Sequence, residues 1–182
     1  MNDNQRLKIL RLATLFLIIG IVVTVFVFRD QIQYLYRLGY IGVFLTTMLA
    51  NATVFIPVPG IMLVFTMGAV FHPLPTAIFG GLGAATGELS GYLLGFSGQA
   101  LLERSERYDR FYNWLKDHRK LSDLAIFAMA VIPNPFFDLA GLAAGSLKIP
   151  ILRFWLFCAA GSIIKMLLIA YAGFAALNTI FK

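Results

Sequence analysis

The chain has 182 residues, of which 59% are hydrophobic and only 13% are charged, and its mean hydropathy is +0.80. A chain this apolar cannot bury its hydrophobic side chains in one water-soluble core, so these values indicate an all-α integral membrane protein. The formal net charge is +6, and the single cysteine, Cys158, excludes an internal disulfide.

Residues 1–40 predict a cytoplasmic tail, one membrane helix and a connection. Residues 2–11 are polar and basic, and residues 12–28 are an uncharged apolar stretch without a small-residue cleavage site before Arg29. These features favour a retained signal-anchor helix over a cleaved signal peptide.

Residues 41–97 predict a re-entrant hairpin followed by a spanning helix. Pro57 and Pro59 interrupt the apolar stretch 41–71, and neither arm has the ~20 apolar residues needed to cross ~30 Å of hydrocarbon. Proline ends a helix, so we expect a turn inside the membrane. Residues 74–96 are long enough to cross. Six glycines in this helix predict a close-packing face: Gly80, Gly81, Gly83, Gly87, Gly91 and Gly95.

Residues 98–123 form the most polar stretch of the chain after the N-terminal tail. Arginines, lysines and acidic residues alternate there with Tyr108, Phe111 and Leu115 at helical spacing. The pattern predicts an amphipathic linker helix on the cytoplasmic membrane surface. A solvated connecting helix would show the same pattern.

Residues 124–182 predict a second hairpin and a final spanning helix. Pro133-Asn134-Pro135 breaks the hairpin 124–147, and the helix runs from Pro150 to about residue 177. Lys148, Arg153 and Trp155 lie near the start of this helix, where basic and aromatic side chains serve as interfacial anchors.

The two hairpin-plus-helix segments repeat each other. Pro57 and Pro59 correspond to Pro133 and Pro135 at an offset of 76 (133 − 57, 135 − 59). An offset of 77 pairs Gly68 with Gly145, Pro73 with Pro150, and Glu88 with Lys165 (145 − 68, 150 − 73, 165 − 88). A cytoplasmic N-terminus places most lysines and arginines inside, and the hairpins then enter from opposite sides. This is the pattern of an inverted repeat, whose interface is the usual place for a translocation site.

The few polar groups at membrane depth are the candidate site. We expect Asp138 in the first turn of the returning half-helix to approach Lys165, because an unpaired charge at the bilayer centre costs ~2.5–3.5 kcal/mol. Depth arithmetic places Glu88 and Lys165 on opposite sides of the midplane, so we expect Glu88 to face Arg153 or Lys148 instead. Two alternatives remain: Asp138 as a helix-capping acid, and Glu88 and Lys165 as side chains that snorkel to the nearer interface. The candidate lipid-path residues are Asp138, Lys165, Glu88, Asn51, Asn134, Pro57, Pro59, Pro133 and Pro135.

The sequence predicts no enzyme. It contains no nucleotide motif or nucleophile triad, and His72 and His118 lack partners at metal-ligand spacing. We therefore expect no catalytic residue, no metal, no cofactor and no nucleic-acid partner. Membrane phospholipids are the expected partners, and a homo-oligomer remains open.

The string Ile132-Pro133-Asn134-Pro135-Phe136-Phe137-Asp138-Leu139-Ala140-Gly141 resembles the signature of the VTT (DedA, SNARE-associated) superfamily. Residues 83–89 and 161–165 are also similar to that superfamily, specifically to the branch that contains the vacuole membrane protein. The resemblance covers roughly residues 40–175. It implies a lipid scramblase or lipid transporter.

The departures from the family pattern narrow this expectation. Typical bacterial members have arginines where this chain has Ala130 and Phe136, and a glutamate where it has Ile61. Those groups are implicated in proton-coupled transport of polyprenyl phosphate carriers. We therefore expect an energy-independent phospholipid scramblase. The alternatives are a proton-coupled secondary transporter of an anionic lipid carrier such as polyprenyl phosphate, and a non-transporting membrane assembly factor. Without organelle or lipidation signals, a prokaryotic inner (plasma) membrane is the expected location.

Overall fold

The computed structural model describes residues 38–52, 60–98, 106–119, 121–133 and 137–180. The chain divides into two compact units, residues 1–38 and 39–182, and the description below concerns the second. The expected signal-anchor helix and four candidate site residues, Pro57, Pro59, Asn134 and Pro135, lie outside the described residues.

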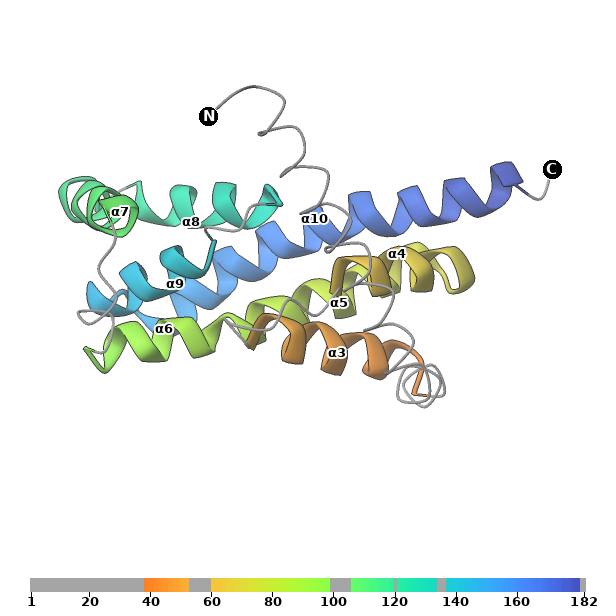
Figure 1. Cartoon of the computed structure of the whole chain (residues 1–182), viewed down its shortest axis with the longest axis horizontal. Helices are drawn as coiled ribbons and strands as arrows, with labels where there is room; N and C mark the ends of the chain where they lie inside the picture. Colours follow the sequence, from red (N-terminus) through yellow and green to blue (C-terminus); the bar gives the residue numbers. More distant parts are fainter. Residues whose placement is uncertain (1–37, 53–59, 99–105, 120, 134–136, 181–182) are drawn as a thin grey trace, which may run out of the picture. The chain divides into compact units, whose positions relative to one another are not determined.

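The described residues form helices without strands, so the prediction of an all-α fold is confirmed for them (Figure 1). The bounds are α3 Tyr40–Ala52, α4 Gly60–Val70, α5 Pro73–Gly87, α6 Leu89–Phe96, α7 Glu106–Asp117, α8 Ser122–Val131, α9 Phe137–Ser146 and α10 Ile151–Ile180. Two short helices followed by a long helical stretch occur twice, as α3, α4 and α5–α6, and as α8, α9 and α10.

The helix expected over residues 74–96 is divided at Glu88. The α-helical hydrogen bonds continue through the division, because Glu88 N donates to Ala84 O at 3.0 Å and Tyr92 N donates to Glu88 O at 3.2 Å. The segment is therefore one distorted helix rather than two helices joined by a loop. In contrast, α10 is unbroken over 30 residues, about 45 Å at ~1.5 Å per residue. Among the described residues, α10 alone is long and apolar enough to cross a membrane, judged by length and composition.

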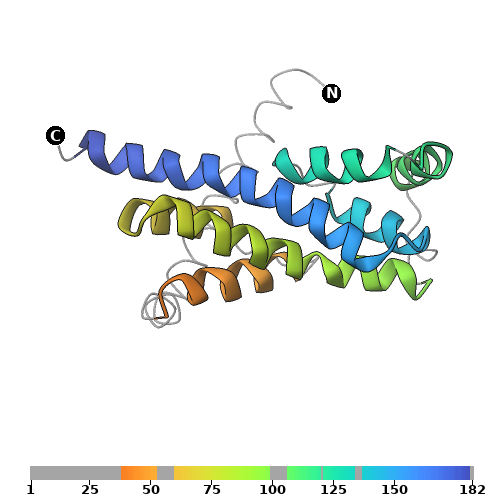
Figure 2. The ribbon, with the colours of Figure 1, turned by 180° about the vertical axis from the view of Figure 1, so that it is seen from behind.

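Helices α5 and α10 cross at the centre of the bundle (Figures 1 and 2). Gly81 abuts the backbone of Ile163, and Trp155 Nε1 donates to Thr86 Oγ1 at 3.3 Å. Residue numbers rise along α5 as they fall along α10, so the two helices are antiparallel.

The four short helices pack around this central pair in two ways. Helix α3 packs on α5 and α8 packs on α10, so each first arm contacts the long helix that follows it in sequence. Helix α4 packs on α10 and α9 packs on α6, so each second arm contacts the long helix of the other half. The two halves are thereby interlocked.

The glycines of α5 and α6 do not form the single packing face that the sequence predicts. All six are buried, but they contact different neighbours because α5 and α6 lie among several helices. Gly83 and Gly87 lie against α3, Gly81 lies against α10, and Gly91 and Gly95 lie against α9.

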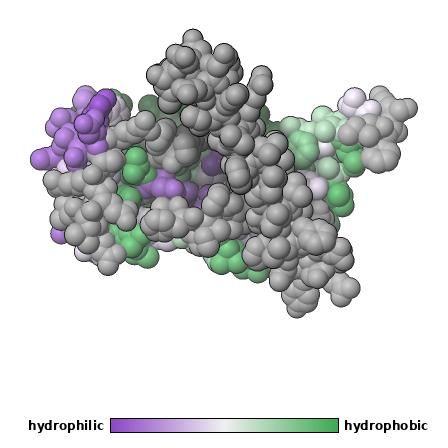
Figure 3. Space-filling view, viewed as in Figure 1, coloured by the Kyte–Doolittle hydropathy of each residue, from purple (hydrophilic) through white to green (hydrophobic). Residues whose placement is uncertain are grey.

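Helix α7, within the linker 98–123, has one apolar and one charged side. Tyr108 and Leu115 are buried beside Ala143 of α9, and Tyr108 Oη donates to Ser146 Oγ at 3.0 Å. The opposite side of α7 carries exposed charges, which give the hydrophilic surface at the upper left of Figure 3. The apolar side of α7 is therefore used for docking onto the bundle.

The contact between α9 and α6 gives a test of this packing. In Gly145→Ala, the new Cβ would lie 2.7 Å from Phe96 N, a backbone atom that cannot move without separating the helices. We expect a loss of ~1–3 kcal/mol in unfolding free energy and a lower Tm in detergent. The matched control is Gly91→Ala in the same contact, whose Cβ would meet its nearest atom, Asp138 O, at 3.7 Å. Equal losses of stability in both variants would contradict the packing described here.

Candidate functional site

Three ionisable side chains come together where the two halves interlock. Glu88 lies at the division between α5 and α6 and is only 5% exposed. Asp138 is the second residue of α9, and Lys165 lies at the middle of α10; both are half-buried. The side-chain charges of the three residues interact with one another. This cluster, Glu88, Asp138 and Lys165, is called the charge triad below.

Backbone packing between α6 and α9 brings the two carboxylates together. A Cβ at Gly141 would lie 3.5 Å from Glu88 O, and one at Gly91 would lie 3.7 Å from Asp138 O. Both distances are ordinary van der Waals contacts, so α6 and α9 pack closely where they carry Glu88 and Asp138. The Gly91 and Gly141 contacts therefore set the position of Asp138 relative to Glu88.

Lys165 reaches the same place from α10. Its Nζ lies 5.9 Å from the centroid of the Phe137 ring, which is buried and adjacent to Asp138 in sequence. An ammonium at this distance from an aromatic face is attracted by the ring quadrupole. No salt bridge within 4 Å joins any two members of the charge triad, although all three belong to the described residues. The triad is thus an electrostatic cluster without a direct ion pair.

The partner that the sequence suggests for Glu88 is wrong. Glu88 was expected to face Arg153 or Lys148, but its charged neighbours are Asp138 and Lys165. Arg153 is paired with Asp123, and Lys148 is exposed in a turn with a positive φ of 53°. The expectation failed because it placed residues by their depth in the membrane alone. The length of the Lys165 side chain and the packing of α9 on α6 bring Lys165 and Asp138 towards Glu88.

The first hairpin arm ends beside Glu88. Ser90 Oγ donates to Ala52 O at 3.0 Å, which fixes the end of α3 against α6. Asn51 is half-buried near Gly87, and its Nδ2 donates to Thr47 O of its own helix at 2.7 Å. On the other half, Pro133 follows α8 and is exposed. The structure therefore brings Asn51 near the charge triad.

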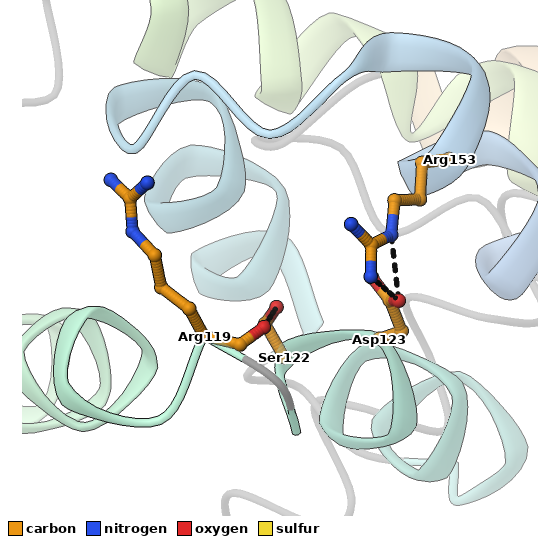
Figure 4. A network of polar contacts seen from close by, with 4 residues as sticks. All are labelled: Arg119, Ser122, Asp123 and Arg153. Carbon is orange, nitrogen blue, oxygen red and sulfur yellow. Dashed lines mark hydrogen bonds and ion pairs between the residues drawn. The ribbon is translucent and has the colours of Figure 1, made fainter.

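Arg153 and Asp123 form an ion pair that the sequence analysis missed (Figure 4). Arg153 Nε donates to Asp123 Oδ2 at 2.7 Å, and Arg153 Nη2 contacts the same oxygen. The pair joins the first turn of α8 to the first turn of α10. Asp123 was grouped with the charged residues of the linker 98–123. Its partner Arg153 lies 30 positions away in sequence, so no local sequence pattern indicates the pair.

Trp155, expected as an interfacial anchor, is half-buried against the core and bonds to Thr86. Lys148 and Arg153 remain candidates for that role, since Lys148 is exposed and the Arg153 side chain is 52% exposed. Within the described part of the chain, no group of three histidine, cysteine or acidic residues is arranged to hold a metal ion.

Comparison with known proteins places the chain in a family. Residues 58–175 match the model of the VTT domain. Two relatives from Arabidopsis thaliana are similar: vacuole membrane protein KMS2 is 33% identical over 96 residues, covering 44% of this chain and 23% of the relative. Vacuole membrane protein KMS1 is 32% identical over 99 residues, covering 44% of this chain and 24% of the relative.

The match therefore spans less than a quarter of either plant protein. No solved structure matches the chain. The names of the relatives refer to a vacuole membrane, so they lend no support to a prokaryotic inner membrane as the location. The domain match covers more than half of the sequence, and the chain is a membrane protein of the VTT-domain (DedA-like) family.

Proposed function

We propose that this protein is an energy-independent phospholipid scramblase, which lets lipids move between leaflets along a polar seam between two re-entrant hairpins. The observation that carries the proposal is the charge triad, three ionisable side chains gathered inside a bundle of apolar helices. Charged groups at membrane depth are costly, so their presence favours a function on a lipid or ion pathway.

An inverted repeat would explain how the seam arises. The second arms, α4 and α9, make matching contacts with the long helices. The contact residues in α9 lie 77 positions after those in α4 (145 − 68, 142 − 65). The residues that they touch in α10 and α6 are 78 positions apart (170 − 92, 173 − 95). The matched contacts are Gly68 with Ala170 and Gly145 with Tyr92, and Phe65 with Gly173 and Leu142 with Gly95. Together with the antiparallel α5 and α10, these contacts support two equivalent hairpins that enter from opposite sides.

The hairpins would give a head group a path. Where a helix ends inside the membrane, its last carbonyls and first amides lack intrahelical partners and need protein or water beside them. The end of α3 lies beside Glu88, and the start of α9 carries Asp138 next to Lys165. A head group passing these polar groups avoids full desolvation, while its acyl chains stay in hydrocarbon.

One further candidate function has a specific observation in its favour. Glu88 is a buried carboxylic acid that interacts with a second carboxylate, Asp138. Two neighbouring carboxylates can share a proton, which is the arrangement a proton-coupled carrier of an anionic lipid would use. Transport by such a carrier would require a proton gradient, whereas scrambling would not.

The test is lipid scrambling by purified protein in phospholipid vesicles without any gradient. A fluorescent phospholipid is placed in both leaflets, and dithionite removes the fluorescence of lipid that reaches the outer leaflet. We expect loss of fluorescence well beyond the outer-leaflet share, and a rate at least several-fold lower in Asp138→Asn. Lys116→Gln on the exposed side of α7 is the control and should scramble normally.

Folded protein that moves lipid only with a proton gradient would favour the carrier. Movement under neither condition would favour an assembly factor.

A further inference from the structure

The charge triad carries two carboxylates and one ammonium, and none of them is neutralised by a direct salt bridge with another. A polar site of this composition offers a ligand both an ammonium and a carboxylate. A ligand that bears one anionic and one cationic group would satisfy both signs. A ligand that bears only negative charge would leave the Asp138 carboxylate without a partner.

The exposure of the three residues says which of them a ligand reaches. Asp138 and Lys165 are half-buried, whereas Glu88 is 5% exposed and lies behind the contact of α6 with α9. Asp138 and Lys165 would therefore touch the ligand. Glu88 is too deeply buried to touch it.

The surface around Lys165 fits a molecule with acyl chains. Ile164 and Leu168, which flank Lys165 on α10, are 40% and 67% exposed. Apolar side chains this exposed in a membrane protein face hydrocarbon, so the accessible part of the triad lies next to lipid-facing surface.

We propose that Lys165 and Asp138 form a binding site for a zwitterionic phospholipid head group, with the phosphate on the Lys165 ammonium and the head-group ammonium on the Asp138 carboxylate. This inference rests on the scramblase function proposed above and adds a substrate preference to it. Zwitterionic phospholipids should pass faster than anionic ones, because an anionic head group offers Asp138 no cation and is repelled by its carboxylate.

The experiment compares two acyl-labelled lipids, phosphatidylcholine and phosphatidylglycerol, in vesicles of one composition: phosphatidylcholine with a minor fraction of phosphatidylglycerol. Acyl labelling leaves the head-group charges intact. For the unmodified protein we expect phosphatidylcholine to scramble roughly tenfold faster, a difference that one weakly screened charge can produce. Asp138→Asn should slow phosphatidylcholine and bring the ratio close to one. Lys165→Gln should slow both lipids and phosphatidylglycerol more, so the ratio widens.

The outcomes separate the two proposals. Equal rates for the two lipids in the unmodified protein, or a ratio that Asp138→Asn leaves unchanged, would overturn the head-group site while scrambling itself stands. No movement of either lipid by protein that elutes as a single folded species would overturn the scramblase proposal and the site with it. Lys116→Gln, remote on α7, should keep both rates and their ratio.

Discussion

Replacing Arg153 by alanine should lower the free energy of unfolding by about 3 kcal/mol, because it leaves the largely buried Asp123 carboxylate without its counter-ion. The Asp123 side chain is 12% exposed, and both of the Arg153 nitrogens in the contact meet the same oxygen, Oδ2. The other oxygen, Oδ1, is buried without a hydrogen-bond partner. The carboxylate therefore depends on Arg153 for its neutralisation.

The measurement is thermal unfolding in detergent, followed by the fluorescence of Trp114 and Trp155. A change of 1 kcal/mol shifts Tm by ~2–4 °C in a protein of this size, so we expect a fall of roughly 6–12 °C. The double variant Asp123→Ala, Arg153→Ala should recover much of this loss, because it also removes the uncompensated charge.

Arg110 provides a matched control for that experiment. It also pairs with an acidic residue, Glu106, at 3.5 Å, but the two side chains are 80% and 91% exposed. Surface pairs of this kind contribute little, because water already solvates both charges. Arg110→Ala should leave Tm almost unchanged. If Arg110→Ala and Arg153→Ala lowered Tm equally, the distinction between the partly buried pair and the exposed pair would be wrong.

The sequence predicted the order of the helices well because their boundaries depend on local chemistry. The apolar stretch 41–71, interrupted at Pro57 and Pro59, became α3 and α4, and α5 begins at Pro73, a residue that suits a first helical turn. The second half of the chain shows the same agreement, because α10 begins directly after Pro150. Hydrophobic stretches and proline positions can be read without knowing any contact.

The partners of the charged residues could not be predicted in the same way. Depth along the membrane was calculated from residue counts, which ignore helix rotation, tilt and side-chain length. The contact of Gly141 with the Glu88 carbonyl depends on α9, which lies some 50 residues away in sequence. The Asp123–Arg153 pair likewise depends on how α8 packs on α10.

Replacing Lys165 by methionine should destabilise the bundle by ~1–3 kcal/mol, because the triad would then hold two carboxyl groups and no cation. Methionine keeps most of the side-chain length, so the change removes mainly the ammonium. Glu88 and Asp138 would then repel each other or take up a proton, and either response in a poorly solvated region costs free energy.

A double-mutant cycle isolates this effect from lost packing. Glu88→Gln combined with Lys165→Met should be more stable than Lys165→Met alone, because one of the two uncompensated carboxylates is gone. We expect a coupling of ~1–3 kcal/mol between the two positions, measured by unfolding in detergent. Lys116→Met on the exposed side of α7 should show no loss and no coupling to Glu88. Additive effects of the Glu88 and Lys165 substitutions would mean that the two charges do not interact, and the charge triad would reduce to separate side chains. Strong coupling would instead identify Glu88 as the group that holds the Lys165 ammonium in the bundle, since Glu88 is the more deeply buried of the two carboxylates.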